Sequence, residues 1–479
     1  MNIAIVGYNL GWVLTFESGF MLLPALVGLI YGEKEGWPYL IVGVVGLLIG
    51  LLFVRKKPKN KQFYTKEGFA TVGLAWILMS IIGAIPLCVS KDIPNYIDAL
   101  FETASGLSTT GASILRDVEA VSHVGLFWRS FTHFIGGMGI FVFLLAIMPM
   151  VGGLNMHLLR AESPGPVVGK LVPKMKDSSQ ILYLIYIFLT VLEFILLWIF
   201  GMNPFEALCT SIATAGTGGF GIYGDSIGGF NTALKWIVAI FMILFGINFN
   251  AYFLLLARKF KDIFKIDEIK VYLSMILISV VAITINIFKM YEHFGDALTD
   301  AFFQVASLVT STGFATTDFN QWPTFSKTVL ILIMICGACA GSTGGGIKVS
   351  RFIIMFKAII QEINLFIHPR SVKSVEMDGK AVDKTVVRSV CVYFLIFGVV
   401  YFVSVFLISF NKFDMVTTFT SVLATINNMG PGLEMVGPAG SFADFNWFSK
   451  LVFIFDMLAG RLELYPILLL ILPAMWKKH

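Results

Sequence analysis

Ten long apolar segments dominate the sequence, and they restrict the chain to folds that cross a lipid bilayer. Hydrophobic residues make up 57% of the chain and charged residues 14%, which leaves too few polar side chains for a water-exposed surface. A soluble enzyme, a nucleic-acid-binding protein and a disordered chain are therefore excluded. Since about 20 apolar residues cross the hydrocarbon layer as a helix, we predict spans at roughly 8–30, 37–54, 68–90, 123–149, 180–201, 231–257, 271–289, 327–360, 386–410 and 447–475.

The basic residues indicate which ends of these spans face the cytoplasm. Of the 35 lysines and arginines, 25 fall on every second connection or at the C-terminus. Cytoplasmic connections of membrane proteins carry this excess of positive charge. The pattern predicts ten spans with both termini in the cytoplasm. The basic segments are 55–66, 157–177, 258–270, 348–388 and the last residues of the chain.

The opposite connections contain an internal repeat. Three of them, at 98–111, 206–219 and 300–313, begin with an acidic residue followed by alanine and end thirteen residues later in glycine. A fourth copy at 417–430 is weaker, because its acid, Asp414, comes three residues before the segment. The copies recur about every hundred residues, a spacing that indicates one repeated structural unit.

Each copy is too short to cross a membrane but long enough to enter it as a half-helix. The C-terminal end of such a helix carries a partial negative charge that favours a cation. The following Thr- and Gly-rich chain can expose its backbone carbonyls, and four such loops around an axis form a cation filter. A single loop of this kind is more simply read as an ordinary extracellular turn, but four matched copies favour the filter. The predicted filter residues are Thr109, Thr110, Gly111, Thr217, Gly218, Gly219, Ser311, Thr312, Gly313, Asn428, Met429 and Gly430.

A glycine-rich segment interrupts the eighth predicted span between Cys336 and Gly346. Glycine weakens a helix, so this span should unwind in its middle. A phosphate-binding loop is disfavoured because Ile347 separates the last glycine from Lys348. A metal or redox pair at Cys336 and Cys339 lacks a second pair or a histidine. The remaining interpretation is a mobile loop beneath the filter.

Arg461 lies within the last predicted span, where an unpaired charge is costly. Asp456 and Glu463 do not have the spacing that brings helix side chains together, so its partner should lie on another span. Arg461 is either half of a buried salt bridge or a cation below the filter that contacts the glycine-rich loop.

A basic residue also lies near the start of the span after each repeat copy. We expect these side chains to reach the membrane interface, and the alternative is that they pair with acids of the half-helices. The four residues are Arg129, Lys235, Lys327 and Lys450.

Six sequence motifs resemble the Trk/Ktr/HKT superfamily of potassium transporters, in particular its TrkH branch, the membrane subunits of bacterial Trk potassium uptake systems. The resemblance covers essentially the whole chain, including the first two spans, which lie outside the repeat. The fourth loop departs from a Thr-x-Gly pattern, as family members commonly do. The motifs are Thr109–Ser113, Gly218–Phe220, Ser311–Phe314, Asn427–Gly432, Gly341–Lys348 and Gly460–Glu463.

The resemblance implies an all-α integral membrane fold. Four pseudo-symmetric units, each consisting of span, pore helix, filter loop and span, would surround one pore. We therefore divide the chain into two N-terminal spans at 1–60 and pore units at 61–156, 157–262, 263–368 and 369–479. The resemblance also implies a homodimer in the bacterial plasma membrane and a cytosolic, TrkA-like, nucleotide-binding regulatory ring. The four filter glycines imply potassium preference, and the implied gate is Gly337, Gly341, Ser342, Thr343, Gly344, Gly345, Gly346 and Arg461.

Two other functions were weighed against potassium uptake. A cation-coupled secondary transporter of a polar solute would typically show inverted repeats, whereas these four copies face the same side. A membrane-embedded enzyme would need converging acids or histidines, and the spans offer only Glu193, Asp456, Arg461 and Glu463. We therefore expect no enzymatic activity, no nucleic-acid partner, no cofactor on this chain, and potassium at the filter as its only metal.

Overall fold

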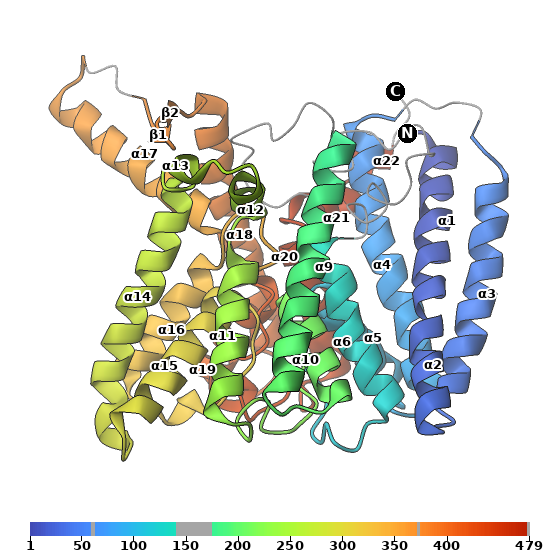
Figure 1. The fold of residues 1–479 in the computed structure, drawn as a ribbon. Helices are drawn as coiled ribbons and strands as arrows, with labels where there is room; N and C mark the ends of the chain where they lie inside the picture. Colours follow the sequence, from blue (N-terminus) through green and yellow to red (C-terminus); the bar gives the residue numbers. More distant parts are fainter. Residues whose placement is uncertain (59–62, 140–174, 371–373, 477–479) are drawn as a thin grey trace.

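Helices form nearly all the regular structure of the computed structural model, which describes residues 1–58, 63–139, 175–370 and 374–476. A short antiparallel hairpin, β1 (Glu376–Met377) with β2 (Lys380–Ala381), is the exception in these ranges. The predicted all-α membrane architecture is confirmed (Figure 1). Short helical turns complete the fold: α13 (Phe260–Ile263), η1 (Phe288–Met290), η2 (Phe319–Gln321), η3 (Glu434–Val436) and α22 (Pro473–Trp476).

Six helical segments are long and apolar enough to cross a bilayer in the described part of the chain. The first consists of two consecutive helices, and it packs against the second and third segments. These segments match six of the predicted spans. They are α1 (Ile3–Phe20) with α2 (Leu22–Tyr31), α3 (Gly36–Arg55), α4 (Thr65–Val89), α9 (Met175–Ile199), α14 (Asp267–Ile287) and α18 (Lys384–Ile408).

The other four predicted spans are shorter or broken. The predicted span 231–257 is not one straight helix, because α11 (Thr232–Gly246) and α12 (Phe249–Leu256) meet at 90°. Ile247 is extended, and the Asn248 side chain accepts a hydrogen bond from the Asn250 amide, which starts a new helix. Of the predicted span 123–149, α6 (His123–Met138) is described, and 140–149 lies outside the described residues.

The eighth and tenth predicted spans are each divided in two. The glycine-rich segment separates α16 (Thr324–Cys336) from α17 (Val349–Ile367), as the sequence predicted. The tenth span is not continuous, because α20 (Trp447–Arg461) ends before α21 (Tyr465–Ile471) begins. Glu463 and Leu464 between them have φ values of 56° and 69°, which no right-handed helix allows.

Four short helices precede the predicted filter loops: α5 (Tyr96–Leu107), α10 (Pro204–Gly216), α15 (Phe294–Val309) and α19 (Met415–Ile426). They are too short to cross a bilayer. In Figure 1, α5, α10 and α15 lie in the lower half of the molecule, whereas both chain ends lie at the top. Asn95, Asn203 and Asp414 cap three of these helices by accepting amide hydrogen bonds. Asp300 is not near a helix start as predicted, because α15 begins at Phe294.

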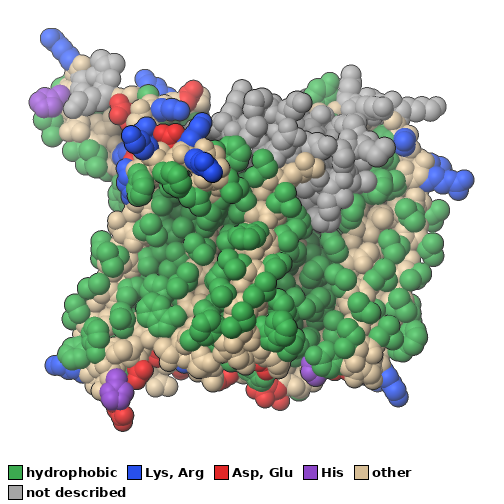
Figure 2. Space-filling model, viewed as in Figure 1, with side chains coloured by type: hydrophobic (Ala, Val, Ile, Leu, Met, Phe, Trp, Pro, Cys, Tyr) green, Lys and Arg blue, Asp and Glu red, His purple; other side chains and the backbone are tan. Residues whose placement is uncertain are grey.

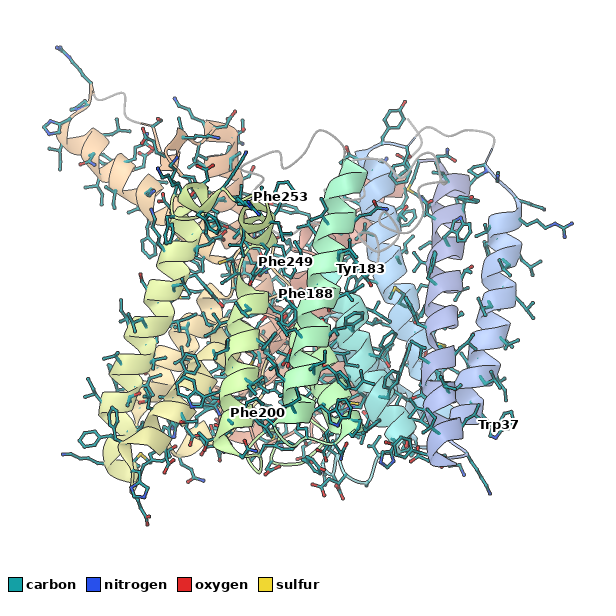
Figure 3. The ribbon with its side chains drawn as sticks, viewed as in Figure 1. Trp37, Tyr183, Phe188, Phe200, Phe249 and Phe253 are labelled. Carbon is teal, nitrogen blue, oxygen red and sulfur yellow. The ribbon has the colours of Figure 1, made fainter. Side chains whose placement is uncertain are left out.

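Charged side chains gather at the two ends of the molecule. Figure 2 shows lysines and arginines mainly near the top, where some acids also lie, acids with a few basic side chains near the bottom, and a hydrophobic belt between the two ends. Trp37 and Phe200 lie toward the lower edge of this belt, as expected for aromatic side chains at a membrane interface (Figure 3). The chain is therefore a multi-pass membrane protein.

Candidate functional site

The four predicted filter loops share one unusual backbone conformation. The first residue of each loop is a non-glycine residue in the left-handed region, where side chains other than glycine are uncommon. Their φ values agree within a few degrees: 57° at Thr109, 54° at Thr217, 58° at Ser311 and 53° at Asn428. The four helices therefore end in the same way, although the residue differs.

The next residue in each loop closes the same turn. Its amide donates to the carbonyl oxygen five residues earlier, the closure that ends many helices at a left-handed residue. The donor–acceptor distances are 2.8 Å for Thr110 to Ser105, 3.0 Å for Gly218 to Ala213, 2.9 Å for Thr312 to Ser307 and 2.8 Å for Met429 to Ala424. Each loop thus leaves its helix in the same local direction.

The loops contact one another as a closed ring in chain order. A β-carbon built on Gly111 would lie 1.9 Å from the Gly218 carbonyl oxygen, and one on Gly219 would lie 2.0 Å from the Thr312 oxygen. A β-carbon on Gly313 would lie 3.2 Å from the Gly430 amide nitrogen, and one on Gly430 would lie 2.8 Å from the Gly111 oxygen. We number the loops in chain order as loop 1 (109–111), loop 2 (217–219), loop 3 (311–313) and loop 4 (428–430). Each loop therefore touches the next one, and loop 4 touches loop 1.

The backbone carbonyl oxygens of this ring accept no hydrogen bond from the described part of the protein. Within the described ranges, none of the twelve predicted filter residues has a carbonyl that accepts a hydrogen bond. The Thr110 hydroxyl forms a hydrogen bond with the Ser108 hydroxyl, and the Thr312 hydroxyl forms one with the Thr310 hydroxyl, each at 2.7 Å. Backbone carbonyls away from water normally have partners, so twelve free ones in a ring are suited to replace the water around a cation.

A buried ion pair supports the first two loops. Arg129 on α6 donates from Nε to Glu102 Oε1 at 2.8 Å, and both side chains are buried. Glu102 also accepts the Ile114 amide at 2.9 Å, while the Arg129 guanidinium lies 4.1 Å from the centre of the Phe220 ring. The expectation that Arg129 extends to the membrane interface is therefore wrong, because its partner lies inside the protein. Sequence reasoning missed Glu102, the fifth residue of the first repeat copy.

The other three basic residues behave differently. Lys450 donates to Asp98 at 2.6 Å and so connects α20 to α5. Lys327 donates to the Asn320 carbonyl at 3.2 Å, and Lys235 is half-buried on α11. The alternative raised from the sequence, pairing with an acid of a half-helix, is thus found for Arg129 and Lys450.

The remaining repeat acids hold local structure at the outer end. Glu206 accepts the Asn203 amide at 3.1 Å and the Tyr223 hydroxyl at 2.6 Å, and this hydrogen bond raises the pKa of Tyr223 to about 12. Asp300 accepts the hydroxyls of Tyr291 and Thr316 at 2.9 and 2.7 Å. Glu206 thus caps the start of α10, and Asp300 connects the segments before and after α15.

Two further side chains join neighbouring loops, and sequence reasoning missed both roles. The His133 ring lies between Gly106 at the end of α5 and loop 2: Nδ1 donates to the Gly106 carbonyl at 2.8 Å and Nε2 accepts the Phe220 amide at 3.3 Å. The side-chain amide of Asn428 donates from Nδ2 to Thr110 Oγ1 at 3.1 Å and to the Met457 carbonyl at 2.7 Å. These bonds connect loop 1 to loops 2 and 4.

The glycine-rich segment lies directly against the inner side of this ring. The Gly346 amide donates to the Asn427 carbonyl at 2.9 Å, and the Gly345 amide donates to Ser311 Oγ. A β-carbon on Gly344 would lie 2.8 Å from the Thr310 carbonyl oxygen. Gly337, Gly341 and Gly346 have φ values of 72°, 70° and 81°, so glycine permits this path. The Ser342 hydroxyl donates to the Cys339 carbonyl, and the Thr343 hydroxyl donates to the Phe245 carbonyl.

Arg461 joins this segment to another helix. Its Nη1 donates to the Thr343 carbonyl at 2.8 Å, and its Nη2 donates to the Gly137 carbonyl at 2.7 Å on α6. Contact with the glycine-rich loop is one of the two alternatives raised from the sequence. The nearby acid Glu463 pairs with Arg351, and Asp456 accepts the Ser404 hydroxyl at 2.7 Å. Cys336 and Cys339 are free thiols.

Comparisons with known proteins agree with this geometry. The family model described as a cation transport protein, TrkH, matches residues 43–478. The Trk system potassium uptake protein TrkH of Salmonella typhimurium is 36% identical over the full length of both chains, and TrkG of Escherichia coli is 34% identical over 99% of each. The crystal structure of the potassium transporter TrkH from Vibrio parahaemolyticus has a TM-score of 0.89 and 31% identity, with complete coverage of both chains. The chain belongs to the TrkH family of cation transport proteins.

Proposed function

We propose that this chain takes up potassium ions through the ring of four loops. One observation supports the proposal: four loops of matching conformation contact one another in a closed ring, and within the described residues their twelve backbone carbonyls accept no hydrogen bond. The relatives named above are potassium uptake proteins, which favours potassium among the possible cations.

A potassium ion would exchange its water for these carbonyls as it enters. The C-terminal ends of α5, α10, α15 and α19 are directed toward the loops, and their partial negative charge stabilises a cation there. The membrane potential supplies about 2.3 kcal/mol per charge per 100 mV, which accumulates a cation about fifty-fold. Uptake therefore needs no second coupled ion.

We propose that the loop 337–346 and Arg461 form the gate. The loop occupies the space directly below the ring, and the Arg461 charge opposes a cation that has passed the filter. Opening requires the loop to leave its contacts with Asn427 and Ser311. The flexible backbone of its glycines permits such a movement.

The cellular setting follows from the same proposal. The chain would lie in the bacterial plasma membrane with both termini in the cytoplasm. Lysines and arginines gather mainly at the top of Figure 2, the end of the molecule at which Figure 1 marks both termini, and this supports the orientation. It would form a homodimer and bind a TrkA-like, nucleotide-binding ring on its cytoplasmic face. The unit boundaries at 61–156, 157–262, 263–368 and 369–479 remain predictions.

Ion flux into proteoliposomes that contain the purified chain tests this function. We expect flux of potassium and rubidium over sodium and lithium. Gly111→Ser should relax this preference, because its β-carbon would meet the Gly218 carbonyl oxygen at 1.9 Å. Gly398→Ser on α18 is the matched control, since nothing lies within 4 Å of that position.

Two outcomes would contradict the proposal. If no cation flows, with or without the regulatory partner, the cation-coupled secondary transporter becomes the better hypothesis. If Gly111→Ser retains the wild-type preference, the ring is not the selectivity filter.

A further inference from the structure

Two adjacent acids at the N-terminus of α14 bind different parts of the protein. Glu268 is 2% exposed, and its Oε1 accepts the Ala340 amide at 2.6 Å and the Ser350 amide at 3.1 Å. Ala340 belongs to the glycine-rich loop, and Ser350 lies in the first turn of α17. One carboxylate oxygen thus connects the loop to the helix that follows it.

Asp267 points instead to the cytoplasmic surface. Its Oδ2 lies 3.1 Å from Lys357 Nζ on α17 and accepts the Asp378 amide at 3.3 Å. Its own amide donates to Asp378 Oδ1 at 2.8 Å. Asp378 lies at the tip of the β1–β2 hairpin, so three contacts attach the start of α14 to the hairpin and α17.

The hairpin moves with the cytoplasmic helices because it packs on them. Met377 forms a buried cluster with Ile354 of α17 and Val390 of α18. Beyond the hairpin, α17 extends from the body of the molecule at the upper left of Figure 1. A displacement of the hairpin is therefore passed to Asp267, and the neighbouring residue on the same helix is Glu268.

We propose that Glu268 is a positioning residue of the gate loop and that Asp267 couples it to the cytoplasmic hairpin. This inference rests on the proposed gate. Arg461 holds the loop at Thr343 and Lys348 holds it at Gly344, whereas Glu268 holds it at Ala340. Of these three contacts, the one through Glu268 adjoins a residue bound to the cytoplasmic hairpin, where a regulatory partner can act.

Two measurements on the full chain test this proposal. The first is potassium and sodium flux into proteoliposomes. The second is modification of Cys339, a buried thiol inside the gate loop, by a water-soluble methanethiosulfonate. For the second, the other cysteines are replaced: Cys88→Ser, Cys209→Ser, Cys336→Ser and Cys391→Ser.

Removing the carboxylate should release the loop. Glu268→Ala leaves two amides without an acceptor, so we expect about tenfold more potassium flux and faster Cys339 modification, with the potassium-to-sodium ratio unchanged. Glu268→Gln retains an oxygen acceptor but loses the charge, and it should give a rise of about threefold. Asp267→Asn weakens the contact with Lys357 and should also raise potassium flux about threefold.

Asp262→Asn is the matched control. Asp262 lies in α13, just before α14, and its exposed side chain pairs with Lys265 rather than with the hairpin or the loop. It should leave flux and Cys339 modification as in the wild type.

The outcomes separate this inference from the proposed function. If wild type conducts potassium but Glu268→Ala changes neither flux nor Cys339 modification, Glu268 does not position the gate. If Glu268→Ala fails to insert, equal behaviour of Asp267→Asn and Asp262→Asn overturns the coupling. If wild type conducts nothing, the potassium function fails, while Cys339 modification still reports whether Glu268 holds the loop.

Discussion

The outer and inner ends of the proposed conduction path are built in opposite ways. The outer end uses four copies of one backbone turn, with φ values that differ by a few degrees, and each copy touches the next. The inner end uses one loop from a single unit. That loop is held by Arg461 and Glu268, which come from other segments of the chain.

The difference teaches that selectivity and gating have different structural requirements. A filter needs several equivalent oxygens, which repetition supplies through backbone geometry. A gate needs one element that can change its position, and side-chain contacts from distant segments can be broken one at a time. Substitutions at the outer end should therefore alter stability and selectivity, whereas substitutions at the inner end should alter flux.

The largest expected effect is at the outer end. Arg129→Met leaves Glu102 as a buried unpaired carboxylate, which should lower the free energy of unfolding by about 3–5 kcal/mol. Thermal unfolding of the purified chain in detergent measures this loss. The double variant Arg129→Met with Glu102→Gln should recover part of it, because no buried charge remains unpaired. Equal stability of Arg129→Met and wild type would contradict the role of this ion pair.

The second effect is at the inner end. Arg461→Met removes a cation below the filter and its hydrogen bonds to Thr343 and Gly137. Potassium flux should rise about tenfold, equivalent to 1.4 kcal/mol of barrier, with unchanged selectivity. A loss of potassium preference without a rise in flux would mean that Arg461 supports the filter rather than the gate.

The smallest effect is at the outer rim. Lys450→Met breaks the contact with Asp98 between the last unit and the first, and partial exposure should limit the cost to about 1 kcal/mol of unfolding free energy. Arg116→Met is the control, because its pair with Asp444 is more exposed, with 71% and 51% of the two side chains accessible. If both variants lose the same stability, Lys450 contributes no more than a surface pair.

Much of the outer end could be predicted because it repeats. The acid-to-glycine spacing located three loops, a weaker copy indicated the fourth, and the structure brings all four loops into contact. The glycine-rich interruption was also visible in one segment of the sequence. Both features are local patterns of residue type.

The supporting contacts could not be predicted in the same way. Glu102 and Arg129, or Glu268 and Ala340, lie far apart in the sequence and share no periodic pattern. The breaks near Ile247 and Glu463 have Gly246 and Pro466 close by, but such residues do not by themselves mark a break, since Pro86 lies within the continuous helix α4. One clue was available for Glu102: the equivalent position of every repeat copy is polar, at Thr210, Gln304 and Ser421.

The order of contacts in the ring also has a consequence for biosynthesis. Loop 1 is completed by loop 4, and the bond between Asn428 and Thr110 joins residues 318 positions apart. A growing chain therefore inserts three loops into the membrane before the fourth exists. Until the ribosome has added α19 and its loop, the first turn has no neighbour on one side, and a chain truncated earlier cannot close the ring.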